Sequence, residues 1–261
     1  MSSTLPGSLP AFGPAALAAV VVAVYLVIGE PVVGHVLHRR FEGRLRTDSR
    51  ARRSFYRRLL VLEWGLAVLA LVLWLAAPGV GGAAVGLSWP RQWPGPVTWL
   101  LVLLVLVFVL LSTRALRSGA LIETAALQRP GEGRHAEPPG HATLAVLPRT
   151  AGERRLFAVV GVTAGVCEEW LYRGFFLAVV AAVTGGLPAW TLAVGAAVAF
   201  GLAHAYQGPA GILGTGLLGG GMAVMYLQTG SLLLPVVLHA LIDLRFLLVP
   251  AGALPVLRGA R

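Results

Sequence analysis

Seven long apolar runs dominate this sequence and restrict the chain to folding in a membrane. A helix needs about 20 predominantly apolar residues to cross a bilayer. The runs cover residues 12–37, 59–77, 97–113, 156–183, 189–206, 210–228 and 232–249. Only 12% of the residues are charged, about half the share in a soluble domain, so the chain lacks the charge to cover a water-soluble core of this size. Because lipid offers backbone groups no hydrogen-bond partner, we predict an all-α membrane protein of about seven transmembrane helices, with an eighth left open.

The basic residues are segregated along the chain, and all 21 of them are arginine. Residues 39–58 hold nine and residues 114–155 hold seven, whereas the loop 78–96 holds only one. The positive-inside rule therefore places both basic loops and the C-terminus in the cytoplasm and the N-terminus outside. We interpret the net charge of +10 as a topology signal that also contacts anionic lipid, and we do not expect nucleic acid as a partner.

The composition also indicates how the chain is divided. A stretch rich in Pro, Gly and charge over 128–150 is typical of a linker. We predict an N-terminal transmembrane part of about three helices at 1–127, a cytoplasmic basic linker at 128–155, a four-helix core at 156–249 and a cytoplasmic tail at 250–261. The use of arginine alone, with much Ala and Gly, indicates a GC-rich bacterial genome and thus a multi-pass protein of a bacterial inner (plasma) membrane.

Ionisable side chains inside the apolar runs are the candidates for function, because each costs about 2.5–3.5 kcal/mol at the centre of a membrane helix. Those of the C-terminal half are Glu168, Glu169, Arg173, His204, His239 and Asp243. The N-terminal half also contains Glu30, His35, His38 and Glu63. We set these four aside because they lie within a few turns of the expected helix ends.

Helical spacing suggests roles for the candidates on the first run of the core. Glu169 and Arg173 are four residues apart and can pair on one face of a helix. Glu168 points about 100° away from Glu169 and is left as the freer carboxylate, which suits a general base. His204 lies one turn after Phe200 and is a candidate base partner, metal ligand or oxyanion donor.

His239 and Asp243 are also four residues apart. Asp243 either orients the His239 imidazole, or both side chains ligate a metal or stabilise an oxyanion. Together the candidates predict a hydrolytic site on three helices. His204, His239 and Glu168 could hold zinc or another divalent metal with one open position, or Glu168 and a histidine could activate water without metal. The sequence leaves both open.

Three motifs in order resemble the CPBP family of intramembrane proteases, which includes the CAAX prenyl endopeptidases and the bacterial Abi proteins. Its EExxxR motif is similar to Glu168 through Arg173, its FxxxH motif to Phe200 through His204, and its HxxxN/D motif to His239 through Asp243. The resemblance covers roughly residues 150–249.

The resemblance implies a role for each matching residue. Glu168 would be the base that activates water, and His204 would polarise the same water or bind a metal. His239 and Asp243 would stabilise the oxyanion or complete a metal site. Glu169 and Arg173 would support the site, and Phe200 would form its wall. The four-helix core would thus be catalytic.

We therefore expect an intramembrane endopeptidase, dependent on glutamate or metal, that acts on a membrane-associated protein or peptide. The alternative is a non-enzymatic immunity or regulatory protein that keeps the motifs. An ion-coupled transporter has less support, because the sequence has no inverted repeat. One geometric conflict arises, since Glu168 falls near the membrane centre and His204 near the inner end of its run. They can meet only if run 189–206 reaches deeper, if the 207–211 turn is buried, or if a cavity enters from the cytoplasm. The Gly-rich segment 214–221 would allow close helix packing there.

Overall fold

The computed structural model describes residues 5–45, 47–118 and 141–250, and its secondary structure is entirely helical over that part of the chain. The first run forms η1 Leu9–Ala15, which kinks at Gly13, and then one rod made of α1 Ala16–Val24, η2 Tyr25–Gly29 and α2 Glu30–Arg44. The next elements are α3 Ala51–Leu75, η3 Gly82–Val85, α4 Pro96–Arg117 and α6 His141–Val146. The fourth run forms a second rod of α7 Ala151–Glu169, η4 Trp170–Phe175 and α8 Phe176–Thr184. The last elements are α9 Ala189–Ala203, η5 Ala205–Gln207, α10 Gly208–Thr229, α11 Leu233–Leu244 and η6 Arg245–Leu248.

Each of the seven predicted runs is helical, so the prediction of an all-α membrane protein is confirmed. Four helices are long and apolar enough to cross a membrane, namely Leu9–Arg44, Ala51–Leu75, Pro96–Arg117 and Ala205–Thr229. The chain is thus a multi-pass membrane protein. The first part of the predicted linker, residues 128–140, and the tail from 251 lie outside the described residues.

Local signals fix several helix ends. Thr150 begins α7 with a capping box, in which its hydroxyl accepts a bond from the Glu153 N–H and the Glu153 carboxylate accepts from the Thr150 N–H. Helix α7 therefore starts five residues before the predicted core boundary at 156. At the other end, Gly185 and Gly230 adopt the left-handed conformation and end α8 and α10.

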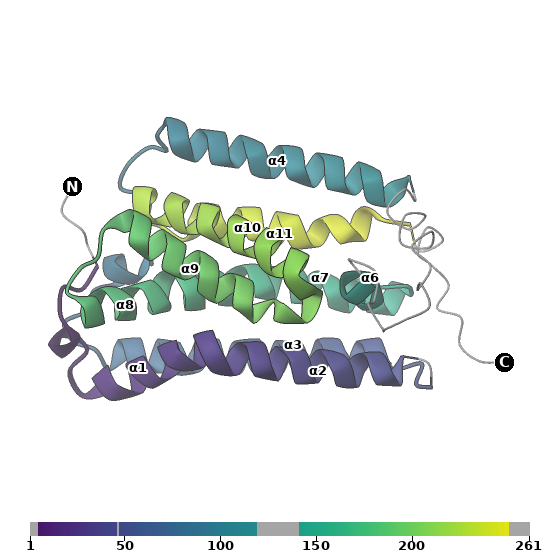
Figure 1. Ribbon diagram of the computed structural model, residues 1–261, viewed down its shortest axis with the longest axis horizontal. Helices are drawn as coiled ribbons and strands as arrows, with labels where there is room; N and C mark the ends of the chain where they lie inside the picture. Colours follow the sequence, from purple (N-terminus) through teal and green to yellow (C-terminus); the bar gives the residue numbers. More distant parts are fainter. Residues whose placement is uncertain (1–4, 46, 119–140, 251–261) are drawn as a thin grey trace.

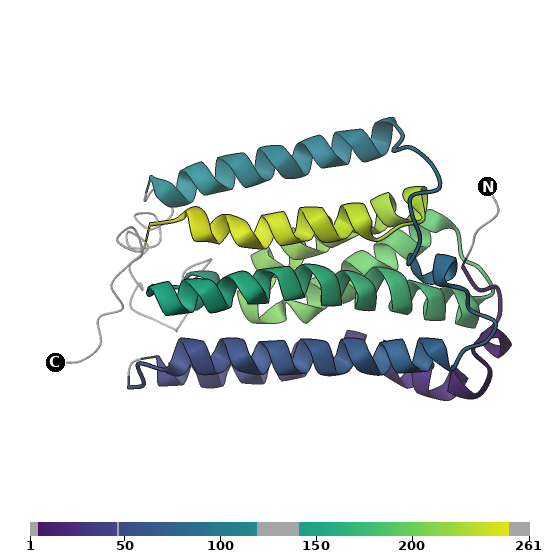
Figure 2. The ribbon, with the colours of Figure 1, turned by 180° about the vertical axis from the view of Figure 1, so that it is seen from behind.

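The helices lie side by side in a layered bundle (Figure 1). Helix α4 forms one outer layer and the α1–α2 rod with α3 forms the opposite one, with the α7–α8 rod and helices α9 to α11 between them. The α2–α3 connection, the last turn of α4 and the first turn of α7 lie together at one end of the bundle, as the view from behind in Figure 2 also shows. We call this the arginine-rich end.

The turn between α9 and α10 resolves the conflict over His204. Helix α9 has only 15 residues, and the turn ends well short of the arginine-rich end (Figures 1 and 2). The Tyr206 ring in this turn lies 4.7 Å from the ring of buried His38 on α2. The turn therefore lies partway along the bundle, although Pro209 and Ala210, at the start of α10, are exposed. This depth is what Glu168 and His204 need in order to meet.

Two glycines bring α7 and α11 into close contact. A Cβ atom on Gly165 would lie 2.9 Å from the Ala240 backbone nitrogen and 3.1 Å from the Val236 carbonyl oxygen. A Cβ atom on Gly161, one turn earlier, would lie 3.2 Å from the Cβ atom of Asp243. Small residues four apart allow helix backbones to approach in lipid. This contact sets the carboxylates of α7 against the side chains of α11.

We expect Gly165→Leu to destabilise the bundle, because the larger side chain must push α11 away from α7. Overpacking of this kind costs about 1–3 kcal/mol. Thermal unfolding of the purified protein in detergent should show a lower Tm. The matched control is Gly65→Leu on α3, where a Cβ atom would meet nothing within 4 Å. Equal Tm values for the two variants would contradict the close contact.

Candidate active site

Glu169 is the centre of a fully buried polar cluster. The side chains of Glu169 and Arg173 are both 0% exposed, and Arg173 Nη1 donates to Glu169 Oε1 at 3.0 Å. His239 Nδ1 on α11 lies 2.7 Å from the same oxygen. The predicted pair of Glu169 and Arg173 is therefore present. His239 joins it, a contact that the spacing of the sequence did not indicate.

Arg173 has partners on two further helices. Its Nη2 donates to the Gly219 carbonyl oxygen on α10 at 3.0 Å, and its guanidinium lies 4.2 Å from the centre of the Phe200 ring on α9. A Cβ atom at Gly219 would lie 2.7 Å from Phe200 and 2.8 Å from Arg173 Nη2. The Gly-rich segment thus provides the predicted close packing, and at Gly219 it makes room for the arginine.

The segment that carries Arg173 is a π-helix, η4 Trp170–Phe175. A second π-helix, η2, lies in the N-terminal rod, and the Tyr172 hydroxyl donates to the Leu26 carbonyl oxygen within it at 3.3 Å. Single π-turns inside helices occur frequently at functional sites. Here they connect the N-terminal rod to the helix that carries both glutamates.

The geometry distinguishes between the two roles left open for Asp243. His239 Nε2 lies 3.9 Å from Asp243 Oδ2, which is beyond hydrogen-bond distance. Glu169, at 2.7 Å from Nδ1, is the carboxylate that orients the imidazole. The interpretation of Asp243 as the orienting group is therefore corrected in favour of Glu169. His239 Nε2 is left facing Glu168, whose Oε2 is 3.9 Å away.

His204 is held by the end of its own helix. Its Nδ1 lies 2.9 Å from the Phe200 carbonyl oxygen, so this nitrogen donates and Nε2 remains available. The Phe200 ring centre lies 4.7 Å from that of His204 and 5.8 Å from that of His239. Phe200 thus contacts both imidazoles on one side and the Arg173 guanidinium on another, as expected for a wall of the site.

One cavity of about 230 Å³ brings the four predicted catalytic residues together. They are Glu168, His204, His239 and Asp243. Glu168 Oε2 is buried without a hydrogen-bond partner among the described residues, although the side chain as a whole is 20% exposed. A second, mostly apolar cavity of about 590 Å³ between α4 and α10 reaches His204, His239 and Asp243 from the other side. Since Glu168 Oε2 has no such partner, the Glu168 carboxylate is free to act on a molecule in the first cavity.

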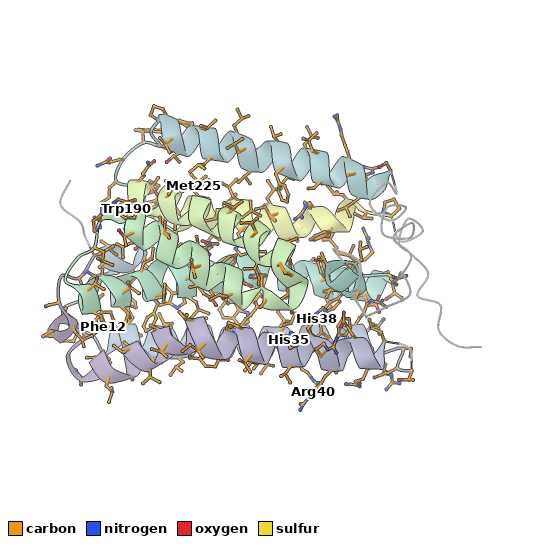
Figure 3. The ribbon with its side chains drawn as sticks, in the orientation of Figure 1. Phe12, His35, His38, Arg40, Trp190 and Met225 are labelled. Carbon is orange, nitrogen blue, oxygen red and sulfur yellow. The ribbon has the colours of Figure 1, made fainter. Side chains whose placement is uncertain are left out.

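Four further residues of this cavity were not among the predicted site residues. Glu30 and His38 of α2, Glu63 of α3 and Tyr206 of the α9–α10 turn also line it. Figure 3 shows His38 on the side of α2 that faces the bundle. The available signal was the cost of a carboxylate within an apolar run, which applies to Glu30 and Glu63 as much as to Glu168. The N-terminal helices thus form one side of the site.

The donor atoms of the cavity can be compared with a metal ligand set. Glu169 holds His239 Nδ1, which leaves Nε2, at 3.9 Å from both Glu168 and Asp243, as the ring nitrogen that could reach a metal. Within the described residues, no group of three or more His, Cys, Asp or Glu side chains is placed to hold a metal ion. We therefore derive no step through a metal, and metal binding stays a prediction.

The comparison with protein families matches the part of the chain that holds this site. The family model described as Type II CAAX prenyl endopeptidase Rce1-like matches residues 151–245. This segment is Rce1-like. The resemblance predicted from the three motifs is confirmed, and the Rce1-like segment contains all seven predicted site residues. Comparisons with curated proteins and with solved structures found no match.

Proposed function

We propose that this chain is an intramembrane endopeptidase that hydrolyses a peptide bond with water activated by Glu168. At family level, the Rce1-like segment implies a protease of the CAAX type. The observation that carries the proposal is the shared cavity of Glu168, His204, His239 and Asp243 within that segment. The substrate class is a membrane-associated protein or peptide, because the site lies inside a bundle of membrane helices.

The proposed reaction uses residues of this chain alone. Glu168 takes a proton from water, and the oxygen attacks the carbonyl carbon of the scissile bond. His204 Nε2 accepts a hydrogen bond from the same water and orients it. In its doubly protonated form, His239 donates from Nε2 to the oxyanion, while Glu169 fixes the ring through Nδ1. Glu168 then passes the proton to the leaving nitrogen as the carbon–nitrogen bond breaks.

The proposed orientation places the arginine-rich end in the cytoplasm of a bacterium. Supporting this, the eight described arginines of 39–58 and those at the end of α4 and the start of α7 belong to that end. The N-terminus would lie outside and the C-terminus in the cytoplasm, with the protein in the inner membrane.

The test is peptide cleavage by the purified full chain in detergent. We expect wild-type protein to cleave a fluorogenic peptide, offered in prenylated and unmodified forms, and we expect His239→Ala to lose at least about 100-fold in rate. Metal content and activity in chelator are measured on the same sample. A stoichiometric metal that is lost in His204→Ala would favour the metal-dependent alternative. No cleavage by folded wild-type protein would favour the non-enzymatic immunity or regulatory alternative.

A further inference from the structure

A groove of about 1060 Å³ lies between α2 and α3 at the arginine-rich end, and it shares only Leu37 and Leu62 with the lining of the catalytic cavity. The five arginines that line it are Arg44, Arg50, Arg53, Arg57 and Arg58, and each of them is exposed. Arg40, also exposed on α2, points away from the bundle (Figure 3). A groove with this density of cations attracts an anion.

The positive charge of the groove is poorly compensated. Asp48 is its one carboxylate and is bonded to Arg44. The backbone N–H of Arg50 and the Arg44 guanidinium hold the pKa of Asp48 below its usual range, so it stays ionised at neutral pH. The side chains of Arg57 and Arg58 form no hydrogen bond or ion pair within the part of the chain that the structure describes. The Ala51 N–H donates to the Asp48 carbonyl oxygen. The first turn of α3 otherwise has no acidic residue and no capping side chain, so this helix N-terminus adds positive potential.

The groove changes character along its length. Away from the arginines it is lined by Leu37 of α2 and by Val61 and Leu62 of α3. Helix α3 is long and apolar enough to span the membrane, so this apolar part lies toward the bilayer interior. A ligand that fits must carry an anion at one end and apolar chains at the other.

We propose that this groove binds an anionic phospholipid, with the phosphate among the arginines and the acyl chains along Leu37, Val61 and Leu62. Guanidinium groups form paired hydrogen bonds with phosphate oxygens. Basic side chains at a membrane surface each contribute to binding of anionic lipid. An acidic peptide would satisfy the arginines but would leave the apolar part of the groove uncovered.

The experiment measures displacement of fluorescent phosphatidylglycerol from the purified full chain in detergent. The competitors are unlabelled phosphatidylglycerol, phosphatidylcholine and inorganic phosphate. The test variant is Arg57→Gln with Arg58→Gln, because Arg53 packs against Gly152 of α7 and its loss could disturb the fold. The matched control is Arg114→Gln with Arg117→Gln on α4, which removes the same charge from exposed positions near the same end.

We expect phosphatidylglycerol to compete at least about tenfold better than phosphatidylcholine, and the groove variant to bind it about 10- to 30-fold more weakly. The α4 variant should stay within about twofold of wild type, and Arg57→Lys with Arg58→Lys should keep most of the binding. Equal losses in the two Gln variants would overturn the proposal in favour of diffuse surface charge. Displacement by millimolar inorganic phosphate, or equal competition by phosphatidylcholine, would overturn it as well. Since no readout is proteolytic, the result is independent of the proposed enzyme activity.

Discussion

Replacing Glu168 by Gln is expected to lower kcat for peptide cleavage by about 10²- to 10⁴-fold, the range typical of general acid–base catalysis. Gln has the shape of Glu but cannot take a proton from water. Because Glu168 Oε2 has no hydrogen-bond partner among the described residues, no structural bond is lost at that atom. The substitution also removes a charge from the interior of the membrane. We therefore expect activity to fall without loss of Tm.

The control for this prediction is Asp48→Asn, which removes a carboxylate outside the catalytic cavity and should cleave at the wild-type rate. Rates and Tm are measured on the same preparations, so that loss of chemistry is separated from loss of fold. A Glu168→Gln protein that cleaves within about threefold of wild type would remove Glu168 from the role of base. A loss of activity accompanied by a large fall in Tm would assign it a structural role.

The helices were predictable from the sequence because lipid leaves the backbone no alternative to helix formation. The seven apolar runs agree with the helices to within a few residues at most ends. The runs 12–37, 59–77 and 156–183 fell short of helical segments that begin or end at Leu9 and Arg44, at Ala51, and at Ala151 and Thr184. These segments continue into charged turns, such as the one capped by Thr150 and Glu153, where hydropathy gives no signal.

The site was predictable only where helical spacing determines a contact. The pair of Glu169 and Arg173 follows from a separation of four residues. The bond from His239 to Glu169 joins residues 70 positions apart, and it depends on the close packing of α7 and α11 at Gly161 and Gly165. The same spacing rule left Asp243 open as the partner of His239, because it takes no account of other helices. The position of Glu30 and Glu63 in the catalytic cavity likewise depends on how α2 and α3 pack against α7.

Replacing Arg173 by Met is expected to cause the largest loss of stability, about 3–5 kcal/mol, because it leaves a buried charge without its partner. Glu169 is 0% exposed and receives Arg173 Nη1 at 3.0 Å, so the variant must keep an uncompensated carboxylate or protonate it. The Gly219 carbonyl oxygen also loses its donor. Activity should fall as well, since Glu169 is the group that orients His239.

A double-mutant cycle separates these contributions. Adding Glu169→Gln to Arg173→Met removes the unpaired charge, so the double variant should have a higher Tm than Arg173→Met alone. It should stay below wild type, because the Gly219 carbonyl still lacks a donor and Phe200 still lacks its guanidinium contact. Thermal unfolding of the four proteins in detergent measures the coupling. A double variant that is no more stable than Arg173→Met would show that the loss comes from packing, and that the ion pair contributes little to holding α7, α9 and α10 together.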